Sequence, residues 1–395
     1  MLKTNVGYSI LNDSYENGVE TAKKTINGLN NPKLALLYSS VLCDHEKLIQ
    51  GVKSVKSIPV VGCTSSGGII VQDGIITGEN GFSGAMMFDD ENLTVGVAGM
   101  QKDGDAREMG RKIALEAIKN ANTDLRPSYF YMVSSPAEEE SYLKGIQDVI
   151  GRVPMFGGSA ADNDVEGNWK IICNDKVISD GVAVAFFYTD NEITTSFTGA
   201  YNETSNMGLI TEVKNNRTLV SIDGVSALKK YAHWTNVSPN NLKGKNLLVA
   251  SITKPLGVKD PLGNLTVIRH PMFGNDQGTR TTSDDTITLG NKVVEGTAII
   301  QLEATVDELI NSTSLTMKNL KKQLYTEPAA YLLIHCGGRR AGIADRIDEV
   351  HKNILKEARG VPFIVPFTFG EYGYDEHSAN ICGGLMLSFT VFGKN

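Results

Sequence analysis

Short apolar runs that end in small residues recur along the chain and predict buried strands. Residues 34–40, 129–135 and 331–338 are each rich in aliphatic or aromatic side chains, as strands with both faces covered are. A helical pattern follows each run; residues 347–358, for example, carry apolar side chains at spacings of three and four. The pattern therefore predicts three strand–helix elements.

After each helical pattern comes a second apolar run that begins near a proline and ends in glycine, at residues 58–64, 153–159 and 361–371. A proline at the first position of a strand costs little, because no ladder hydrogen bond is needed there. Glycine lets the backbone turn sharply at the other end. Each element thus extends to strand–helix–strand.

The chain also repeats itself beyond these elements. Residues 81–88 and 93–97 match residues 181–188 and 193–197 at a constant offset of 100 positions, and residues 384–391 are a third version. We interpret one unit as strand, helix, strand and then an antiparallel strand pair. This predicts an α/β fold in which repeated strand–helix–strand units, with added antiparallel strands, form mixed sheets covered by helices. Two sheets packed face to face would be one such arrangement.

Other segments fit around these units. Apolar spacing predicts helices at residues 14–26 and 103–119, and Thr305-Val-Asp-Glu308 is a capping box that opens a helix to about residue 324. The acidic run Glu138-Glu139-Glu140 is typical of the first turn of a helix. Further strands are expected at residues 247–250, 265–268, 286–289 and 297–302.

Length, charge and cysteine content narrow the class of protein. A chain of 395 residues is expected to form two or three structural units, and the polar stretch 233–241 is the expected boundary between residues 1–232 and 233–395. The net charge is −7, and the basic stripe of a nucleic-acid binder is missing. Five cysteines form no Cys-Xaa-Xaa-Cys pair, which favours a reducing compartment without structural zinc. Because no signal sequence or membrane-length apolar run occurs, we expect a soluble, cytoplasmic protein.

Four glycine-flanked turns follow predicted strands, where ligands usually bind in such sheets. They read Gly62-Cys-Thr-Ser-Ser-Gly-Gly68, Gly157-Gly-Ser-Ala-Ala-Asp-Asn163, Phe369-Gly-Glu-Tyr372 and Cys336-Gly-Gly-Arg-Arg340. Hydroxyl groups, backbone N–H donors and guanidinium groups would together suit a small anionic or zwitterionic ligand, with arginine holding a carboxylate. The candidate ligand-binding residues are Cys63, Thr64, Ser65, Ser66, Gly157, Gly158, Ser159, Asp162, Arg269, Cys336, Arg339, Gly370 and Glu371.

Catalytic and metal sites have weaker support. Cys63 and Cys336 occupy comparable ends of related units, so a two-cysteine enzyme that transfers protons on a small acid is an alternative. A buried cysteine after a strand is the more ordinary reading, and we expect Cys63 to be inert. No phosphate-binding loop, dinucleotide fingerprint, Gly-Xaa-Ser-Xaa-Gly elbow or His-Glu-Xaa-Xaa-His helix occurs. The six histidines form no ligand cluster, so no metal is expected, and a haem held by one histidine remains open.

The order of these motifs resembles the FIST family over nearly the whole chain. The first half is similar to the FIST N domain and the second half to the FIST C domain, which assigns residues 1–232, with two internal repeat units, and residues 233–395 to them. The motifs that carry the resemblance are Val6-Gly-Tyr-Ser9, Val60-Val-Gly-Cys-Thr-Ser-Ser-Gly-Gly68, Pro154-Met-Phe-Gly-Gly-Ser-Ala-Ala-Asp162, Asp180-Gly-Val-Ala-Val184, Ile222-Asp-Gly-Val-Ser-Ala-Leu-Lys-Lys-Tyr231, Pro255-Leu-Gly-Val258, Ile268-Arg-His270, Glu295-Gly296, Cys336-Gly-Gly-Arg339 and Phe369-Gly-Glu371.

The resemblance implies a sensory domain for small ligands such as amino acids, and no enzyme. Some members of the family bind haem and respond to nitric oxide, so a haem-binding gas sensor stays an alternative. Members often act with histidine kinases, cyclic-dinucleotide enzymes or chemotaxis receptors. Because the 395 residues show no output domain, we expect the signal to pass to such a separate protein. No nucleic-acid or membrane partner is expected.

Overall fold

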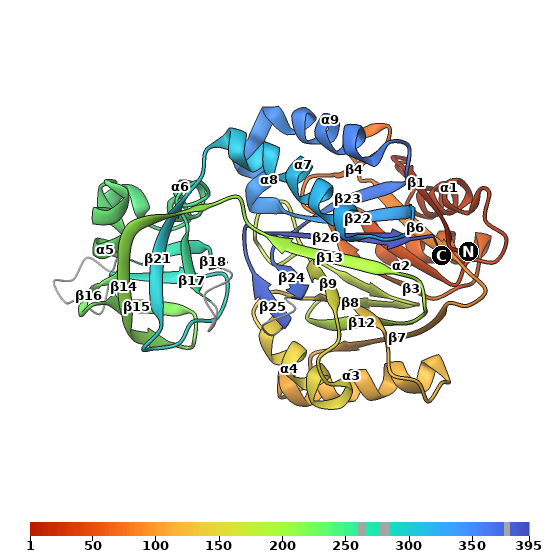
Figure 1. Ribbon diagram of the computed structural model, residues 1–395, viewed down its shortest axis with the longest axis horizontal. Helices are drawn as coiled ribbons and strands as arrows, with labels where there is room; N and C mark the ends of the chain where they lie inside the picture. The colour runs from red at the N-terminus through yellow and green to blue at the C-terminus, as the bar shows by residue number, and fades with distance from the viewer. Residues whose placement is uncertain (260–265, 276–284, 375–379, 395) are drawn as a thin grey trace.

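A computed structural model describes residues 1–259, 266–275, 285–374 and 380–394. The chain forms a larger body and a smaller body joined side by side (Figure 1). The larger body consists of three copies of one unit. Each copy runs strand, helix, strand, helix, strand, β-hairpin and strand.

The elements of the three units follow one order. The first unit comprises β1 (Lys3–Ser9), α1 (Ser14–Ile26), β2 (Leu34–Ser39), α2 (His45–Val55), β3 (Val60–Thr64), β4 (Ile69–Val71), β5 (Gly74–Ile76) and β6 (Ser83–Asp89). The second comprises β7 (Thr94–Gln101), α3 (Ala106–Ala121), β8 (Tyr129–Ser134), α4 (Glu139–Ile150), β9 (Met155–Ser159), β10 (Ile171–Cys173), β11 (Lys176–Ile178) and β12 (Gly181–Tyr188). The third comprises β13 (Ile193–Thr198), α7 (Val306–Gln323), β22 (Pro328–Cys336), α8 (Gly337–Ile343), the 3₁₀ turn η2 (Ala344–Arg346), α9 (Ile347–Ala358), β23 (Phe363–Thr368), β24 (Glu371–Tyr374), β25 (Asn380–Gly383) and β26 (Leu387–Gly393).

Strand pairing confirms the repeat. In the first unit β2 lies parallel to β3 and antiparallel to β6, and β6 also pairs with β1. The second unit pairs β8 with β9 and β12 in the same directions, and the third pairs β22 with β23 and β26. The segments that begin at Gly81 and Gly181 therefore occupy equivalent positions, as the offset of 100 predicted.

Each unit lends its hairpin to the sheet of a neighbouring unit. The hairpin β4–β5 of the first unit pairs with β23 of the third. The hairpin β10–β11 of the second unit pairs with β3 of the first, and β24–β25 of the third pairs with β9 of the second. The exchange is cyclic and gives three six-stranded mixed sheets, which ties the units into one body.

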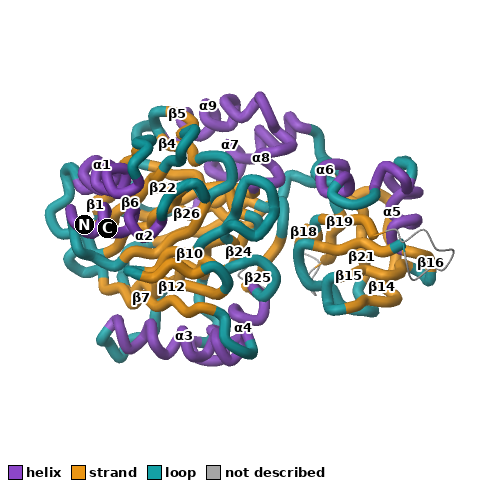
Figure 2. The backbone as a smooth tube through the Cα atoms, turned by 180° about the vertical axis from the view of Figure 1, so that it is seen from behind, coloured by secondary structure: helices purple, strands orange, loops and turns teal. Residues whose placement is uncertain are grey.

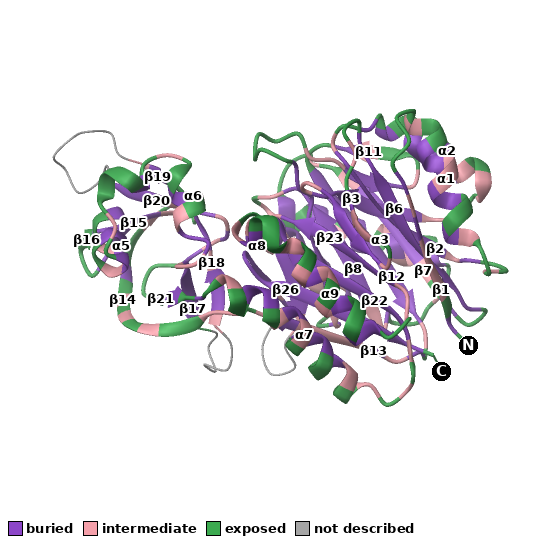
Figure 3. Ribbon diagram, turned by 90° about the horizontal axis from the view of Figure 1, so that it is seen from above, coloured by how far each residue is buried: buried purple, intermediate pink, exposed green. Residues whose placement is uncertain are grey.

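The inner faces of the three sheets meet in one hydrophobic core, and helices cover the outer faces (Figures 2 and 3). On β2, Leu36 and Tyr38 point into the shared core, whereas Ala35 and Leu37 pack with α1 and α2. Because both faces are covered, the strand is apolar at successive positions and not at alternate ones. The helix pair α3 and α4 covers the second sheet, and α7 and α9 cover the third.

The smaller body is inserted between β13 and α7 and has a core of its own. Its elements are β14 (Asn202–Lys214), β15 (Thr218–Ile222), β16 (Val225–Ser226), α5 (Ala227–Thr235), η1 (Pro239–Leu242), α6 (Asn246–Ala250), β17 (Leu256–Lys259), β18 (Thr266–Arg269), β19 (Pro271–Asn275), β20 (Thr286–Leu289) and β21 (Ala298–Glu303). Their strands form one antiparallel sheet in which β18 is an edge strand. No helix among the described residues is long and apolar enough to cross a membrane.

Several expectations are confirmed and three are corrected. The mixed sheets covered by helices, the helices α1 and α3, and the capping box at Thr305 that opens α7 are as predicted. The prediction of two sheets packed face to face was wrong, because the larger body contains three sheets. The expected strand pairs were also wrong, because β6 and β7 enter different sheets, as do β12 and β13.

Residues 247–250, expected as a strand, belong to helix α6; four apolar residues in a row fit either element. The other strands expected between residues 265 and 302 are β18, β20 and β21, except that Leu265 lies outside the described residues. The division at residue 233 stays a prediction.

Candidate ligand site at the junction of the two bodies

Ion pairs hold the smaller body against α4 of the larger one. The Arg217 guanidinium donates from Nη2 to Oε2 of Glu139 at 2.8 Å and to Oε2 of Glu140 at 3.0 Å. Lys292 Nζ donates to Glu138 at 3.1 Å and to the Ser141 hydroxyl at 2.7 Å. The Glu139 side chain is 2% exposed, and burial raises its pKa to about 7 although Arg217 opposes this. The junction is therefore polar and sensitive to charge.

Two hydroxyl groups of the first predicted turn and several of its N–H groups are used within the protein. Ser65 Oγ donates to the carbonyl of Gly68 at 2.6 Å and accepts from the N–H of Phe367 at 2.8 Å. Thr64 Oγ1 accepts from the N–H of Lys170 at 3.0 Å. The backbone N–H of Ser66 donates to the carbonyl of Phe367 at 3.0 Å. This turn therefore fastens the first unit to its neighbours.

The second turn has the same internal role. The Asp162 carboxylate, fully buried, accepts N–H bonds from four successive residues, 165–168, and so caps its own loop. Ser159 Oγ bonds the Tyr372 hydroxyl at 2.8 Å and donates to Glu139 at 3.1 Å. The hydroxyl groups of Thr64, Ser65 and Ser159 and the Asp162 carboxylate are therefore bonded within the protein; their role in ligand binding stays a prediction.

The glycines of this turn permit close packing. The backbone φ of Gly157 is +144°, and a Cβ there would lie 1.9 Å from the Met132 carbonyl oxygen. A Cβ at Gly158 would lie 2.6 Å from Thr368 Oγ1, and one at Gly370 would lie 2.9 Å from Ser159 Oγ. The three glycines thus have a structural reason that needs no ligand.

Arg339 and Glu371 are both fully buried, near Cys336. Arg339 Nη2 donates to the Leu309 carbonyl at 2.9 Å and to Ser312 Oγ, so it holds α7. Glu371 accepts from Thr368 Oγ1 at 3.0 Å and from the Met386 N–H at 2.9 Å. Burial raises the pKa of Glu371 to about 8.

The two cysteines are not equivalent, which corrects the comparison made from the sequence. In the third unit the strand register places Cys336, the last residue of β22, opposite Thr368. In the first unit the matching pair is Ser39 and Thr64, so Ser39, and not Cys63, corresponds to Cys336. Cys63 lies on β3, one position before its end, inside the shared core. Burial raises the pKa of the Cys63 thiol to about 12 and also raises the pKa of Cys336. The two thiols therefore do not occupy equivalent positions of the repeat.

Arg269 lines a cleft of about 480 Å³ between the two bodies, which we call the cationic cleft. Lys144 of α4, Lys292, Asn380 and Glu140 also line it. Arg269 Nη1 donates to the carbonyls of Ile268 at 3.2 Å and Cys382 at 3.1 Å. Its Nε is buried without a hydrogen-bond partner among the described residues. Burial lowers the pKa of Arg269, although the nearby Glu140 carboxylate opposes this.

A second cleft lies on the other side of β18, and we call it the apolar cleft. Its volume is about 260 Å³. All four predicted turns reach it, through Ser66, Asn163, Phe369 and Cys336, and the smaller body contributes His270. Arg269 and His270 are adjacent in the chain, yet they line the two different clefts. The single site expected from the sequence is thus divided between two clefts.

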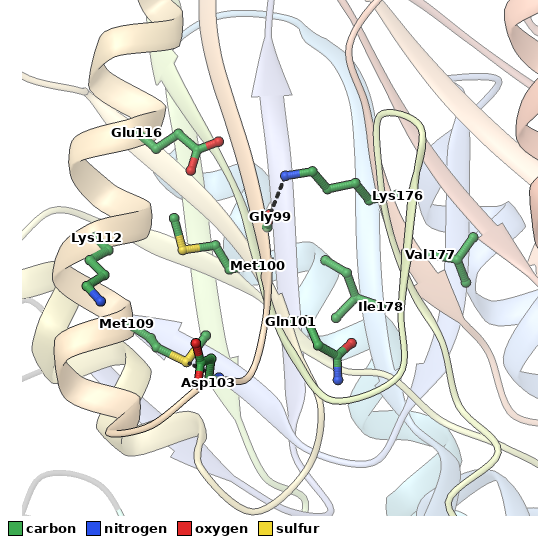
Figure 4. A pocket seen from close by; sticks show the side chains of 10 residues that line it. All are labelled: Gly99, Met100, Gln101, Asp103, Met109, Lys112, Glu116, Lys176, Val177 and Ile178. Atoms are coloured by element: carbon green, nitrogen blue, oxygen red, sulfur yellow. Dashed lines mark hydrogen bonds between the residues drawn. The ribbon is translucent and has the colours of Figure 1, made fainter.

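A third hollow lies away from the junction, between α3 and the hairpin β10–β11 (Figure 4). Lys112 and Glu116 project from α3, and Lys176 Nζ on the opposite side donates to the Gly99 carbonyl at 3.2 Å. It contains none of the predicted site residues. No group of three His, Cys, Asp or Glu side chains in the described part of the chain could hold a metal ion.

Sequence reasoning found Arg269 but missed Arg217, Lys292, Asn380 and His270 as junction residues. The acidic run at 138–140 was interpreted only as a helix start, which it is. Its excess of negative charge was a signal that cations from elsewhere would bind there. No local pattern could have shown which cations those were.

Comparison with solved structures gives only distant likeness. PurLQS from Thermotoga maritima is 8% identical with a TM-score of 0.24, over 100% of this chain and 72% of that one. Phosphoribosylformylglycinamidine synthase II from the same organism is 9% identical with a TM-score of 0.24, over 99% and 72%. No curated protein matches. Residues 33–225 match the FIST N domain and residues 227–374 the FIST C domain, so the chain belongs to the FIST family, whose domains are sensory.

Proposed function

We propose that this protein is a small-molecule sensory module and that the cationic cleft binds a small anionic or zwitterionic metabolite such as an amino acid. The observation that carries the proposal is Arg269. Its Nε is buried and unbonded among the described residues, as are those of Arg217, Arg339 and Arg340. Of these four arginines it is Arg269 that lines the cationic cleft, together with Lys144 and Lys292. A ligand carboxylate would give this guanidinium the partner that it lacks.

The cleft also offers acceptors for an ammonium group. Asn380 donates from Nδ2 to the Val153 carbonyl at 2.9 Å, and its Oδ1 is buried without a partner among the described residues. The Glu140 carboxylate lines the same cleft. The cleft therefore offers both donors and acceptors, which a zwitterion needs. This favours an α-amino acid over a simple anion.

Binding between two bodies gives a way to signal. The cleft walls come from α4 and β25 of the larger body and from the loops of the smaller body around Asn216 and Lys292. A ligand that contacts both walls stabilises one relative orientation of the bodies. We propose that a separate cytoplasmic protein, a kinase, cyclic-dinucleotide enzyme or chemoreceptor, reads that orientation.

A thermal-shift screen with the amino acids, small carboxylates and haem tests this function. A ligand at a hundredfold excess over its Kd stabilises the folded state by about 2.7 kcal/mol. We expect stabilisation by one or a few amino or carboxylic acids, and the ligand should be recovered chemically unchanged. Stabilisation by haem alone, or conversion of the ligand to a product, would overturn the proposal in favour of a gas sensor or an enzyme.

A further inference from the structure

We propose that the apolar cleft is a second ligand site, for a small uncharged ring compound that carries one N–H or O–H donor. This site goes beyond the proposed function, because it shares no lining residue with the cationic cleft. Its walls include α8 of the larger body and α6 of the smaller body, which contact each other. The volume of about 260 Å³ is near the lower end of ligand pockets, about 300 Å³, and suits a molecule of one or two rings.

The lining favours an apolar occupant. Val249 on α6 is 69% exposed, and Val165 on the opposite side is 36% exposed. Leu248, Met272 and Phe369 extend the apolar surface between them. Apolar side chains are open to water on both walls of this cleft. A ligand that covers them lowers the free energy by roughly 25 cal/mol per Å² of apolar area buried.

The charges at the rim do not favour an anion. Lys245 is paired with Glu166, and its Nζ also approaches the Asp164 carbonyl at 3.5 Å. Asp164 and Lys245 both line the cleft. The carboxylates of Glu166 and Asp164 raise the pKa of Lys245, so the charge of this cation is already offset. A ligand without net charge avoids the cost of placing another anion beside these carboxylates.

His270 supplies the polar recognition. Its Nε2 lies 3.1 Å from the Leu248 carbonyl oxygen, and a carbonyl can only accept, so Nε2 carries the hydrogen. Burial lowers the pKa of His270 to about 4, so the ring is neutral near pH 7. Nδ1 is then an acceptor, and no donor from the described residues bonds it. A ligand N–H or O–H would fill this place.

Glycine keeps the floor of the cleft open. A Cβ at Gly338 would lie 3.5 Å from both Cys336 Sγ and His270 Cε1, and 2.8 Å from Leu385 Cδ2. A Cβ at Gly337 would lie 3.3 Å from Ser66 Cβ. Side chains at these positions would occupy the space beside the histidine.

The test uses indole, an uncharged ring with one N–H, and 1-methylindole, which lacks it, titrated into the full chain by calorimetry. We expect indole to bind and 1-methylindole to bind about tenfold more weakly, as one lost hydrogen bond predicts. His270→Phe should abolish the difference between the two probes. Arg269→Met, in the other cleft, should leave indole binding unchanged, so that failure of this site and failure of the proposed function are distinguishable.

Because His270→Phe also removes a bond to the main chain, a second variant blocks the cleft from an exposed position. Ala341 lines the cleft on α8 and is exposed, so Ala341→Phe should fold and should weaken indole binding at least tenfold. The matched control is Ala298→Phe, at an exposed position of β21 outside the cleft, which should bind indole as the wild type does. The proposal is overturned if indole does not bind at millimolar concentration, if 1-methylindole binds equally well, or if Ala341→Phe has no effect.

Discussion

Glu371 allows a stringent test of how the larger body is held together, through the variant Glu371→Gln. The carboxyl group is fully buried at the start of β24, the strand that pairs with the second unit. When protonated it can donate to Thr368 Oγ1 while still accepting from the Met386 N–H; the Cys336 thiol is a further hydrogen-bond partner. Glutamine can make the same two bonds, so the substitution mainly removes the ionisation.

The expected effect follows from the pKa of the carboxyl group. Burial raises it from 4.5 to about 8 in the folded protein, so the unfolded chain loses this proton at a lower pH than the folded protein does. Below pH 4.5 both states are protonated and the full stability is present, and stability is lost as the pH rises toward 8. Since one pKa unit corresponds to about 1.4 kcal/mol, the loss between pH 5 and pH 7 is roughly 2–3 kcal/mol. Glu371→Gln should be spared this loss.

Urea denaturation of wild type and Glu371→Gln at pH 5 and pH 7 measures the difference. The advantage of the variant in free energy of unfolding should grow by roughly 2–3 kcal/mol between the two pH values. The control Glu349→Gln removes a 45% exposed carboxylate and should show no such growth. An advantage that is the same at both pH values, or that shrinks as the pH rises, would refute the reasoning.

Three further outcomes test other parts of the structure. Gly62→Ala places a Cβ 1.7 Å from the Leu37 carbonyl oxygen and should destabilise by about 3 kcal/mol or more in urea denaturation, whereas Gly290→Ala, with 3.5 Å of room, should be nearly neutral. Cys63 is fully buried with its pKa raised to about 12, so its alkylation at pH 7 should require unfolding; rapid alkylation in the folded protein would contradict its place in the core. Arg217→Met leaves the buried Glu139 unpaired and should cost about 3–5 kcal/mol, more at pH 8 than at pH 5 because the carboxyl can be protonated at the lower pH. Arg111→Met, at an exposed pair, should cost under about 1 kcal/mol.

The repeat was predictable because strands buried on both faces appear in the sequence as unbroken apolar runs. Leu36 and Leu37 pack on opposite sides of the first sheet. The unbroken apolar run therefore contains the residues of both covered faces. The cyclic exchange of hairpins was not predictable, since β4, β10 and β24 have three or four residues each and carry no sign of their partners. Short strands find those partners only once the units are assembled.

Part of the candidate site was predictable, because arginines near strand ends can be recognised in the sequence. Arginine near a strand end identified Arg269 as a ligand contact, a role that stays a proposal. The same reasoning selected Arg339, whose guanidinium is bonded to α7. The Nε of Arg339 is also buried without a hydrogen-bond partner among the described residues, but Arg339 lines neither cleft. Which arginine lines a cleft depends on packing between distant segments. The junction between Arg217 and α4 likewise joins residues about 80 positions apart.

Calorimetric titration of the acid or amino acid identified by the screen tests the central claim most directly, with Arg269→Met and Arg339→Met as a matched pair. The account predicts that Arg269→Met loses about 2–5 kcal/mol of binding free energy, which is roughly thirtyfold or more in Kd. Arg339→Met, once shown to be folded, should bind with the affinity of the wild type, because its guanidinium holds α7 and does not line the cationic cleft. Unchanged affinity in Arg269→Met would contradict the account.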